Sequence, residues 1–309
     1  MTRLSSLRSK SAHAEFGKLN SSAGKPLMSD IQLISRIAFT LICFAANSVF
    51  GRLALKTTSI DPATYTFMRM LSAAAMLWML VAVQQRPKSI GGTWAGGVAL
   101  FGYAAFFSLA YKDIVTGTGA LILFGAVQLC MISVSLFKGE KLSMLQWLGL
   151  ALALAGLVGL VLPGIAPPPL GAAALMAAAG VAWGFYTVLG AGTPNPLLAT
   201  AGNFTRTLPM SVLFLIVAWR GLTFDGWGLF YASLSGAITS ALGYAIWYSV
   251  LPKLKGPQAA SLQLSVPVIA SLGGIVFLDE ALSLRLIFAS AAILFGIGLV
   301  IYERSKVPL

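Results

Sequence analysis

The sequence of 309 residues predicts an all-α membrane protein with ten transmembrane helices, arranged as two five-helix repeats of inverted topology. Three observations predict this fold. Hydrophobic residues make up 58% of the chain and charged residues only 10%, whereas a soluble domain carries about 25% charged residues. The apolar residues gather in runs long enough to cross a bilayer, and short motifs of the first half recur in the second. This composition excludes a soluble enzyme, a disordered protein and a fibrous repeat.

A transmembrane helix needs about 20 mostly apolar residues, because the hydrocarbon core of a bilayer is about 30 Å thick. Prolines, glycines and charged residues divide the chain into ten such runs. The predicted helices lie at 34–55, 62–84, 92–112, 115–137, 143–163, 170–190, 196–219, 226–250, 257–278 and 284–303. The predicted organisation is a disordered basic cytoplasmic tail at 1–33, a first repeat at 34–163, a Pro-rich linker at 164–169, a second repeat at 170–303 and a cytoplasmic tail at 304–309.

The basic residues predict the orientation of the chain. Of the 21 Lys and Arg residues, 14 fall in the tails and in the loops on the side of the N-terminus, and five fall in the loops on the other side. The positive-inside rule therefore places both termini in the cytoplasm, in an inner (plasma) membrane protein. A net charge of +12 could indicate a nucleic-acid partner. The cations are spread over short loops and one tail, so we expect the lipid bilayer as partner and no nucleic acid.

An internal repeat relates the two halves of the chain. Three pairs of segments match in the same order: 67–71 (FMRML) with 204–208 (FTRTL), 102–108 (GYAAFFS) with 243–249 (GYAIWYS), and 139–143 (GEKLS) with 279–283 (DEALS). Five helices per copy is an odd number, so the second copy enters the membrane from the opposite side. Inverted repeats are typical of secondary transporters, whose substrate site lies near the midplane between the copies. The alternative is a duplicated scaffold with a purely structural role.

These motifs resemble a known family. The segments that resemble the EamA domain of the drug/metabolite transporter superfamily lie at 121–126, 139–143, 266–270 and 279–283. Trp183-Gly184-Phe185-Tyr186 is similar to the first-helix motif of that family, whereas the first copy has Phe44-Ala45-Ala46-Asn47 there. Pro267 has no counterpart, because Val127 occupies the matching position. The resemblance implies a ten-helix exporter of a small-molecule substrate, similar in size and layout to aromatic amino-acid exporters.

Arg69 and Arg206 are the two charged residues that lie more than five residues from either end of a predicted span. A charged side chain at a helix centre costs about 2.5–3.5 kcal/mol, so each should face protein or water rather than lipid. One interpretation is a pair of guanidinium groups, one per copy, that bind a substrate carboxylate, with the deeper Arg206 contributing more. The other is a structural arginine that hydrogen-bonds neighbouring carbonyl oxygens.

Aromatic and amide side chains at matching places in the two copies complete the candidate site. Tyr103 and Phe107 lie four residues apart, and the second copy has aromatic residues on the matching helix face. Such residues suit a cavity with apolar walls and a few polar groups, although they could equally serve helix packing. The candidate substrate-binding residues are Asn47, Arg69, Tyr103, Phe107, Gln128, Trp183, Tyr186, Arg206, Tyr244, Trp247, Tyr248 and Gln263.

The positions of the acidic residues argue against a proton relay within the membrane. All nine lie in loops, tails or helix ends, so the midplane lacks the Asp, Glu or His that proton relays use. Glu140 and Glu280 match across the copies, and we expect them to tether helix ends or to act in gating. The sequence has no Walker A motif, no nucleophile paired with a base and no cluster of metal ligands. We therefore expect no catalytic residue, no metal and no cofactor.

The sequence thus predicts a secondary transporter that exports small metabolites, with amino acids, including aromatic ones, as the expected class. The transport cycle expected of inverted repeats is alternating access around a midplane cavity. Three alternatives remain open at this point: an exporter of multiple drugs or lipophilic compounds, a receptor or scaffold without flux, and a passive channel. The sequence leaves the oligomeric state open.

Overall fold

The computed structural model describes residues 30–84, 90–137, 139, 141–162, 167–254, 259 and 262–304. The chain divides into two compact units, at residues 1–35 and 36–309. In the described part of the first unit, residues 30–35 are helical. The first helix therefore begins at Asp30, four residues before the predicted span. The rest of the predicted N-terminal tail and residues 305–309 lie outside the described residues.

The second unit consists of helices joined by short connections, and no strand occurs among the described residues. The helices are α2 (Asp30–Thr57), α3 (Pro62–Gln84), α4 (Trp94–Tyr111), α5 (Thr116–Phe137), α6 (Met144–Val161), α7 (Leu170–Gly190), α8 (Pro196–Val217), α9 (Gly226–Leu234), the π-helix η2 (Ser235–Leu242), α10 (Gly243–Val250), α12 (Val266–Leu278) and α13 (Leu284–Arg304). Because α9, η2 and α10 are continuous, these helices form ten segments, and the described chain also has two single-turn 3-10 helices, η1 (Trp219–Gly221) and η3 (Leu251–Lys253). The all-α membrane fold is confirmed.

Seven of these segments are long and apolar enough to cross a membrane: α2, α3, α4, α5, α7, the α9–η2–α10 segment and α13. α6 and α12 are apolar but shorter, and α8 carries several polar residues in its first half. The predicted run at 257–278 is not one helix, because Leu264 and Ser265 form a turn and α12 starts at Val266. Pro267 in the first turn of α12 explains the break, since proline lacks the N–H that a continuing helix needs.

Polar residues at the helix ends fix where the helices begin. The Asp61 carboxylate accepts hydrogen bonds from the backbone N–H groups of Ala63 and Thr64, at 2.9 and 3.0 Å, at the start of α3. Asp225 caps α9 in the same way. A side-chain oxygen at this position satisfies N–H groups that have no partner within the helix. The acidic residues Asp61 and Asp225 are therefore used as caps, as their places at helix ends suggest.

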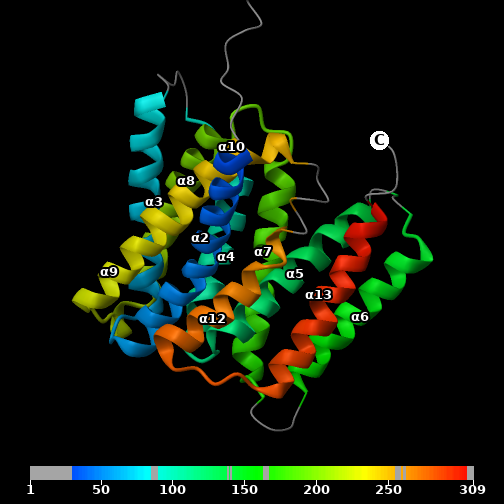
Figure 1. Cartoon of the computed structure of the whole chain (residues 1–309). Helices are drawn as coiled ribbons and strands as arrows, with labels where there is room; N and C mark the ends of the chain where they lie inside the picture. Colours follow the sequence, from blue (N-terminus) through cyan, green and yellow to red (C-terminus); the bar gives the residue numbers. More distant parts are fainter. Residues whose placement is uncertain are drawn as a thin grey trace, which may run out of the picture. The chain divides into compact units, whose positions relative to one another are not determined.

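Helices that match across the two copies pack against each other. α3 contacts α8, α5 contacts α12 and α6 contacts α13, and α6 and α13 lie side by side in Figure 1. A Cβ atom on Gly149 would lie 2.5 Å from the carbonyl oxygen of Gly296, so these two backbones approach closely. Trp78 of α3 donates a hydrogen bond to Thr205 of α8 at 2.8 Å. Contacts between equivalent helices are expected when two copies are related by a twofold axis.

Candidate functional site

A small buried cavity lies between helices of both copies. Its volume is about 10 Å³, close to the space of one water molecule. Helices α2, α3, α4, α5, α7 and α10 and the π-helix η2 contribute to its wall. The lining residues are Phe44, Asn47, Ser48, Arg69, Tyr103, Leu123, Phe124, Trp183, Thr239, Ser240 and Tyr244. We refer to this space as the central cavity.

Arg69 of α3 supplies the charge of the central cavity. Its side chain is 2% exposed, and its Nη2 donates to the Tyr103 hydroxyl at 2.9 Å and to Ser240 Oγ at 3.4 Å. The guanidinium lies over two rings, 5.0 Å from the centre of Tyr103 and 4.8 Å from the centre of Phe107. Its Nε and Nη1 have no hydrogen-bond partner. Buried donors of this kind are rarely left unpaired unless a ligand or water completes them.

A chain of hydrogen bonds extends from Arg69 across the cavity. The Asn47 amide donates from Nδ2 to the Tyr103 hydroxyl at 2.9 Å. Its Oδ1 accepts from Ser235 Oγ at 2.7 Å and from Thr239 Oγ1 at 3.4 Å. Asn47 and Tyr103 belong to the first copy and the two hydroxyls to the second. The network therefore joins the copies at the cavity.

The π-helix η2 brings the hydroxyls of the second copy to this network. A π-helix bonds residue i to i+5 and often occurs at functional sites. A Cβ atom on Gly236 would clash with the carbonyl oxygen of Arg69, so only glycine allows η2 to lie this close to α3. Ser235, Thr239 and Ser240 are not among the residues predicted for the site, although small polar residues in an apolar run before the 243–249 motif are a signal for such a site.

Aromatic rings form most of the remaining wall. The Trp183 ring stacks on Tyr103 with centres 5.5 Å apart and meets Phe124 edge-on at 5.3 Å. Phe44 contacts both Trp183 and Tyr244, at 6.2 and 5.7 Å. Of the predicted aromatic residues, Tyr103, Trp183 and Tyr244 line the cavity, whereas Phe107 lies against Arg69, and Trp247 packs behind Phe44 at 6.0 Å.

A second pocket lies at the end of the bundle where α4 and α8 begin. Its volume is about 230 Å³, and it is lined by Gly92, Thr93, Gly96, Tyr186, Leu189, Gly190, Thr193, Pro196, Ala199, Thr200, Asn203 and Tyr248. We refer to it as the vestibule. Tyr244 lies between the two spaces, since it lines the central cavity and its ring contacts those of Tyr186 and Tyr248, at 6.4 and 6.1 Å. The predicted residues Tyr186 and Tyr248 therefore line the vestibule.

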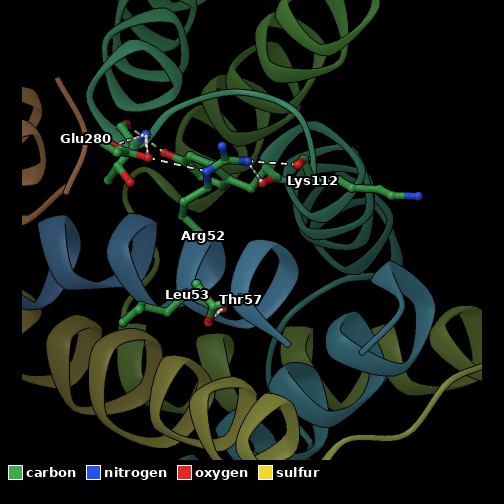
Figure 2. A network of polar contacts seen from close by, with 7 residues as sticks. Arg52, Leu53, Thr57, Lys112 and Glu280 are labelled. Carbon is green, nitrogen blue, oxygen red and sulfur yellow. Dashed lines mark hydrogen bonds and ion pairs between the residues drawn. The ribbon is translucent and has the colours of Figure 1, made fainter. Parts of the chain in front are cut away.

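An ion pair holds the other end of the bundle together (Figure 2). Arg52 Nε lies 3.3 Å from Glu280 Oε1, and the two side chains are only 8% and 12% exposed. Arg52 Nη1 also donates to the carbonyl oxygens of Tyr111 and Lys112 at 2.8 Å. Both Glu280 oxygens accept from the Thr116 backbone N–H, at 2.8 and 3.0 Å. This end is opposite the vestibule, because Thr93 of the vestibule wall caps the start of α4 and Tyr111, which bonds to Arg52, ends it.

This ion pair joins the first copy to the second. Glu280 thus tethers helix ends across the two copies, whereas its match Glu140 lies outside the described residues. Arg52 is one of the five basic residues that were assigned from the sequence to the loops on the side away from the N-terminus. That assignment is wrong, because Arg52 lies within α2 and is buried. Its role depends on an acidic residue 228 positions away, which no local pattern reveals.

Comparison with known proteins identifies the family. The model of the EamA-like transporter family matches residues 34–162 and again 170–302. The chain belongs to this family. An uncharacterized protein of Pseudomonas aeruginosa is 48% identical over 278 residues, which is 90% of this chain and 97% of the relative. An uncharacterized transporter of Archaeoglobus fulgidus is 25% identical over 255 residues, covering 79% of this chain and 90% of the relative.

A solved crystal structure shares the fold of this EamA-like protein. It aligns with a TM-score of 0.62 and 22% identity, covering 88% of this chain and all of the solved chain. At this identity the likeness concerns the fold alone. The family and the fold agree in describing a multi-pass membrane transporter with two EamA copies.

The remaining candidate residues lie away from the central cavity of this EamA-like protein. Arg206 Nη1 donates to the carbonyl oxygens of Gly91 and Gly202, at 2.6 and 2.9 Å, and its guanidinium lies 5.9 Å from the Trp94 ring. These contacts are those of a structural arginine that hydrogen-bonds neighbouring carbonyl oxygens, which is the second interpretation given above for Arg69 and Arg206. Gln128 is buried on α5 and Gln263 is half-buried before α12, and neither lines the cavity or the vestibule.

Proposed function

We propose that the protein is a secondary transporter that exports small amphipathic metabolites, with amino acids as the expected class, by alternating access. We further propose that it lies in the inner membrane with both termini in the cytoplasm. Membership of the EamA-like transporter family supports transport. The basic residues of the tails and loops support the orientation.

The central cavity is the observation that carries this proposal. It lies between helices of both copies, where secondary transporters with inverted repeats hold their substrates. Its wall combines the rings of Phe44, Trp183 and Tyr244 with the single guanidinium of Arg69. Such a wall suits a solute with an apolar body and a carboxylate.

The difference between the two ends of the bundle supports alternating access. On one side, the vestibule is lined by Tyr186 and Tyr248, whose rings contact Tyr244 in the wall of the central cavity. On the other side, the Arg52–Glu280 ion pair and its bonds to Tyr111, Lys112 and Thr116 tie the two copies together. A carrier must close one end while the other end is open, so an ion pair that spans the copies fits a gate.

Counterflow in proteoliposomes tests this function. Vesicles loaded with unlabelled amino acids or related metabolites should accumulate the same labelled compound, and accumulation should saturate. A passive channel gives no transient accumulation, and a receptor or scaffold gives no flux at all. Accumulation of lipophilic cations alone would favour the multidrug alternative, which the positive charge of Arg69 opposes.

A further inference from the structure

Most hydrogen-bond acceptors around the central cavity are already in use, and the exception among the described lining residues is the hydroxyl of Ser48, which has no partner. Asn47 Oδ1 accepts from Ser235 and Thr239, and the Tyr103 hydroxyl oxygen accepts from Asn47 and Arg69. The Ser235 carbonyl oxygen, which lies on the π-helix, accepts from the hydroxyls of Thr239 at 2.6 Å and Ser240 at 2.8 Å. Apart from a bond to Ser48 Oγ, a hydrogen-bond donor of a ligand would have to displace one of these bonds.

Around the central cavity, the hydrogen-bond donors without a partner, by contrast, outnumber the acceptors without one. Nε and Nη1 of Arg69 carry three of the five guanidinium hydrogens, and both atoms are buried without a partner. The Tyr103 hydroxyl accepts two hydrogen bonds, and its own hydrogen has no acceptor in the described part of the chain. The lining residues include no acidic side chain. The wall therefore has a positive charge and unused donors, which together call for an anion.

We propose that the ligand of the central cavity is a monocarboxylate with an apolar, preferably aromatic, body and without a charged amine. This inference rests on the proposed function, the export of small amphipathic metabolites, and selects among these a monocarboxylate in place of the expected amino acid. The carboxylate would accept charge-assisted hydrogen bonds from Arg69 and Tyr103. The apolar body would pack on Phe44, Trp183 and Tyr244. An ammonium group there would be buried near Arg69 with no acidic side chain in the wall to balance its charge, which is unfavourable.

Binding requires the cavity to enlarge, because about 10 Å³ holds a water molecule and not a ring. Tyr244 lines the cavity, and its ring contacts those of Tyr186 and Tyr248, which line the 230 Å³ vestibule. A shift of the Tyr244 ring would join the two spaces and give access from the vestibule end. The ligand would then fill the joined space with its carboxylate at Arg69.

Four compounds with the same phenyl body test the proposal: 3-phenylpropanoate, phenylalanine, 2-phenylethylamine and 3-phenylpropanol. Binding to the purified protein is measured by thermal shift and by competition in counterflow. We expect 3-phenylpropanoate to bind about tenfold or more tightly than phenylalanine, because phenylalanine buries an ammonium group beside Arg69 without an anionic partner. The amine and the alcohol should bind more weakly than the carboxylate.

Variants of Arg69 and Arg206 test whether the preference for a carboxylate arises in the central cavity. Arg69→Gln should remove the advantage of 3-phenylpropanoate over 3-phenylpropanol, and Arg69→Lys should keep part of it. Arg206→Gln is the matched control and should leave the ratio unchanged, because Arg206 lies on the Gly91 and Gly202 carbonyls. The wild-type order of the four compounds remains a test even if an Arg69 variant does not fold.

Each outcome decides between the two proposals. Tighter binding of phenylalanine than of 3-phenylpropanoate overturns the inference and leaves the proposed amino-acid exporter intact. Tightest binding of the amine, or a carboxylate preference that survives Arg69→Gln, also overturns it. Absence of counterflow for every metabolite overturns the proposed function itself.

Discussion

Neutralising Glu280 is expected to loosen the end of the bundle that the Arg52–Glu280 ion pair holds. The two side chains are 8% and 12% exposed and 3.3 Å apart, so solvent screens the pair little. Glu280→Gln removes the charge but keeps an oxygen that can accept from the Thr116 N–H. The expected loss is that of one hydrogen bond between charged groups, about 1.5–3 kcal/mol. Removal of the whole side chain would approach the cost of breaking a buried pair, about 3–5 kcal/mol.

This loss should shift the population towards a state that is open at the ion-pair end. If the pair forms only when that end is closed, about 1.5–3 kcal/mol raises the open population roughly tenfold to a hundredfold. A cysteine at Ser48, which lines the cavity and is 1% exposed, reports the opening. The native Cys43 and Cys130 are replaced first. Labelling by a membrane-impermeant maleimide, added from the ion-pair side, should become at least about tenfold faster in Glu280→Gln.

Two further variants make this experiment specific. Arg52→Gln should have the same effect, and the double variant should add little, because both substitutions remove one interaction. Arg220→Gln is the control, since Arg220 is exposed and lies over the Trp219 ring. Unchanged labelling in Glu280→Gln, or effects of the two substitutions that simply add, would refute a gate at this position.

Three other predictions concern the fold, the orientation and the coupling. Gly236→Ala should lower the Tm, because overpacking against the Arg69 carbonyl oxygen should destabilise the protein by about 1–3 kcal/mol. Gly298→Ala is the control and should leave the Tm unchanged, because Gly298 has open space around it. Reporters at residue 309 should be cytoplasmic and tags at 221–225 should be accessible from outside; a periplasmic signal at residue 309 contradicts the ten-span topology. Substrate exchange across the membrane should persist at equal pH on both sides with a protonophore present, because no acidic side chain or His lines the central cavity. Substrate accumulation that requires a pH gradient and is lost in Glu280→Gln would contradict this prediction.

The fold could be predicted from the sequence because its signals are strong and local. Apolar runs of about 20 residues can satisfy their backbone only as helices in a bilayer, and the repeated motifs relate the two halves directly. The break before α12 is less evident. Pro267 stands within a run that otherwise matches the unbroken α5, and the effect of a proline depends on whether neighbouring helices satisfy the freed groups.

The site could be predicted only in part, because the role of each side chain depends on its contacts in the folded protein. Arg69 and Arg206 occupy matching positions, yet one lines the central cavity and the other bonds backbone carbonyls near the vestibule. Their sequence contexts do not reveal this difference, and the expectation that Arg206 would contribute more rested on depth alone. Arg52 and the hydroxyls of η2 were missed because long-range pairing and a π-helix leave no periodic pattern in the sequence.

Equilibrium exchange of a labelled carboxylate by the wild-type protein, Arg69→Gln and Arg206→Gln tests the central claim most directly. That claim is that substrate binds in the cavity between the two copies, at Arg69. With each rate corrected for the amount of folded protein, Arg69→Gln should lose at least about tenfold in exchange, the value of one lost charge-assisted hydrogen bond. Arg206→Gln should exchange at nearly the wild-type rate. Normal exchange by Arg69→Gln, or a larger loss in Arg206→Gln, would contradict the account.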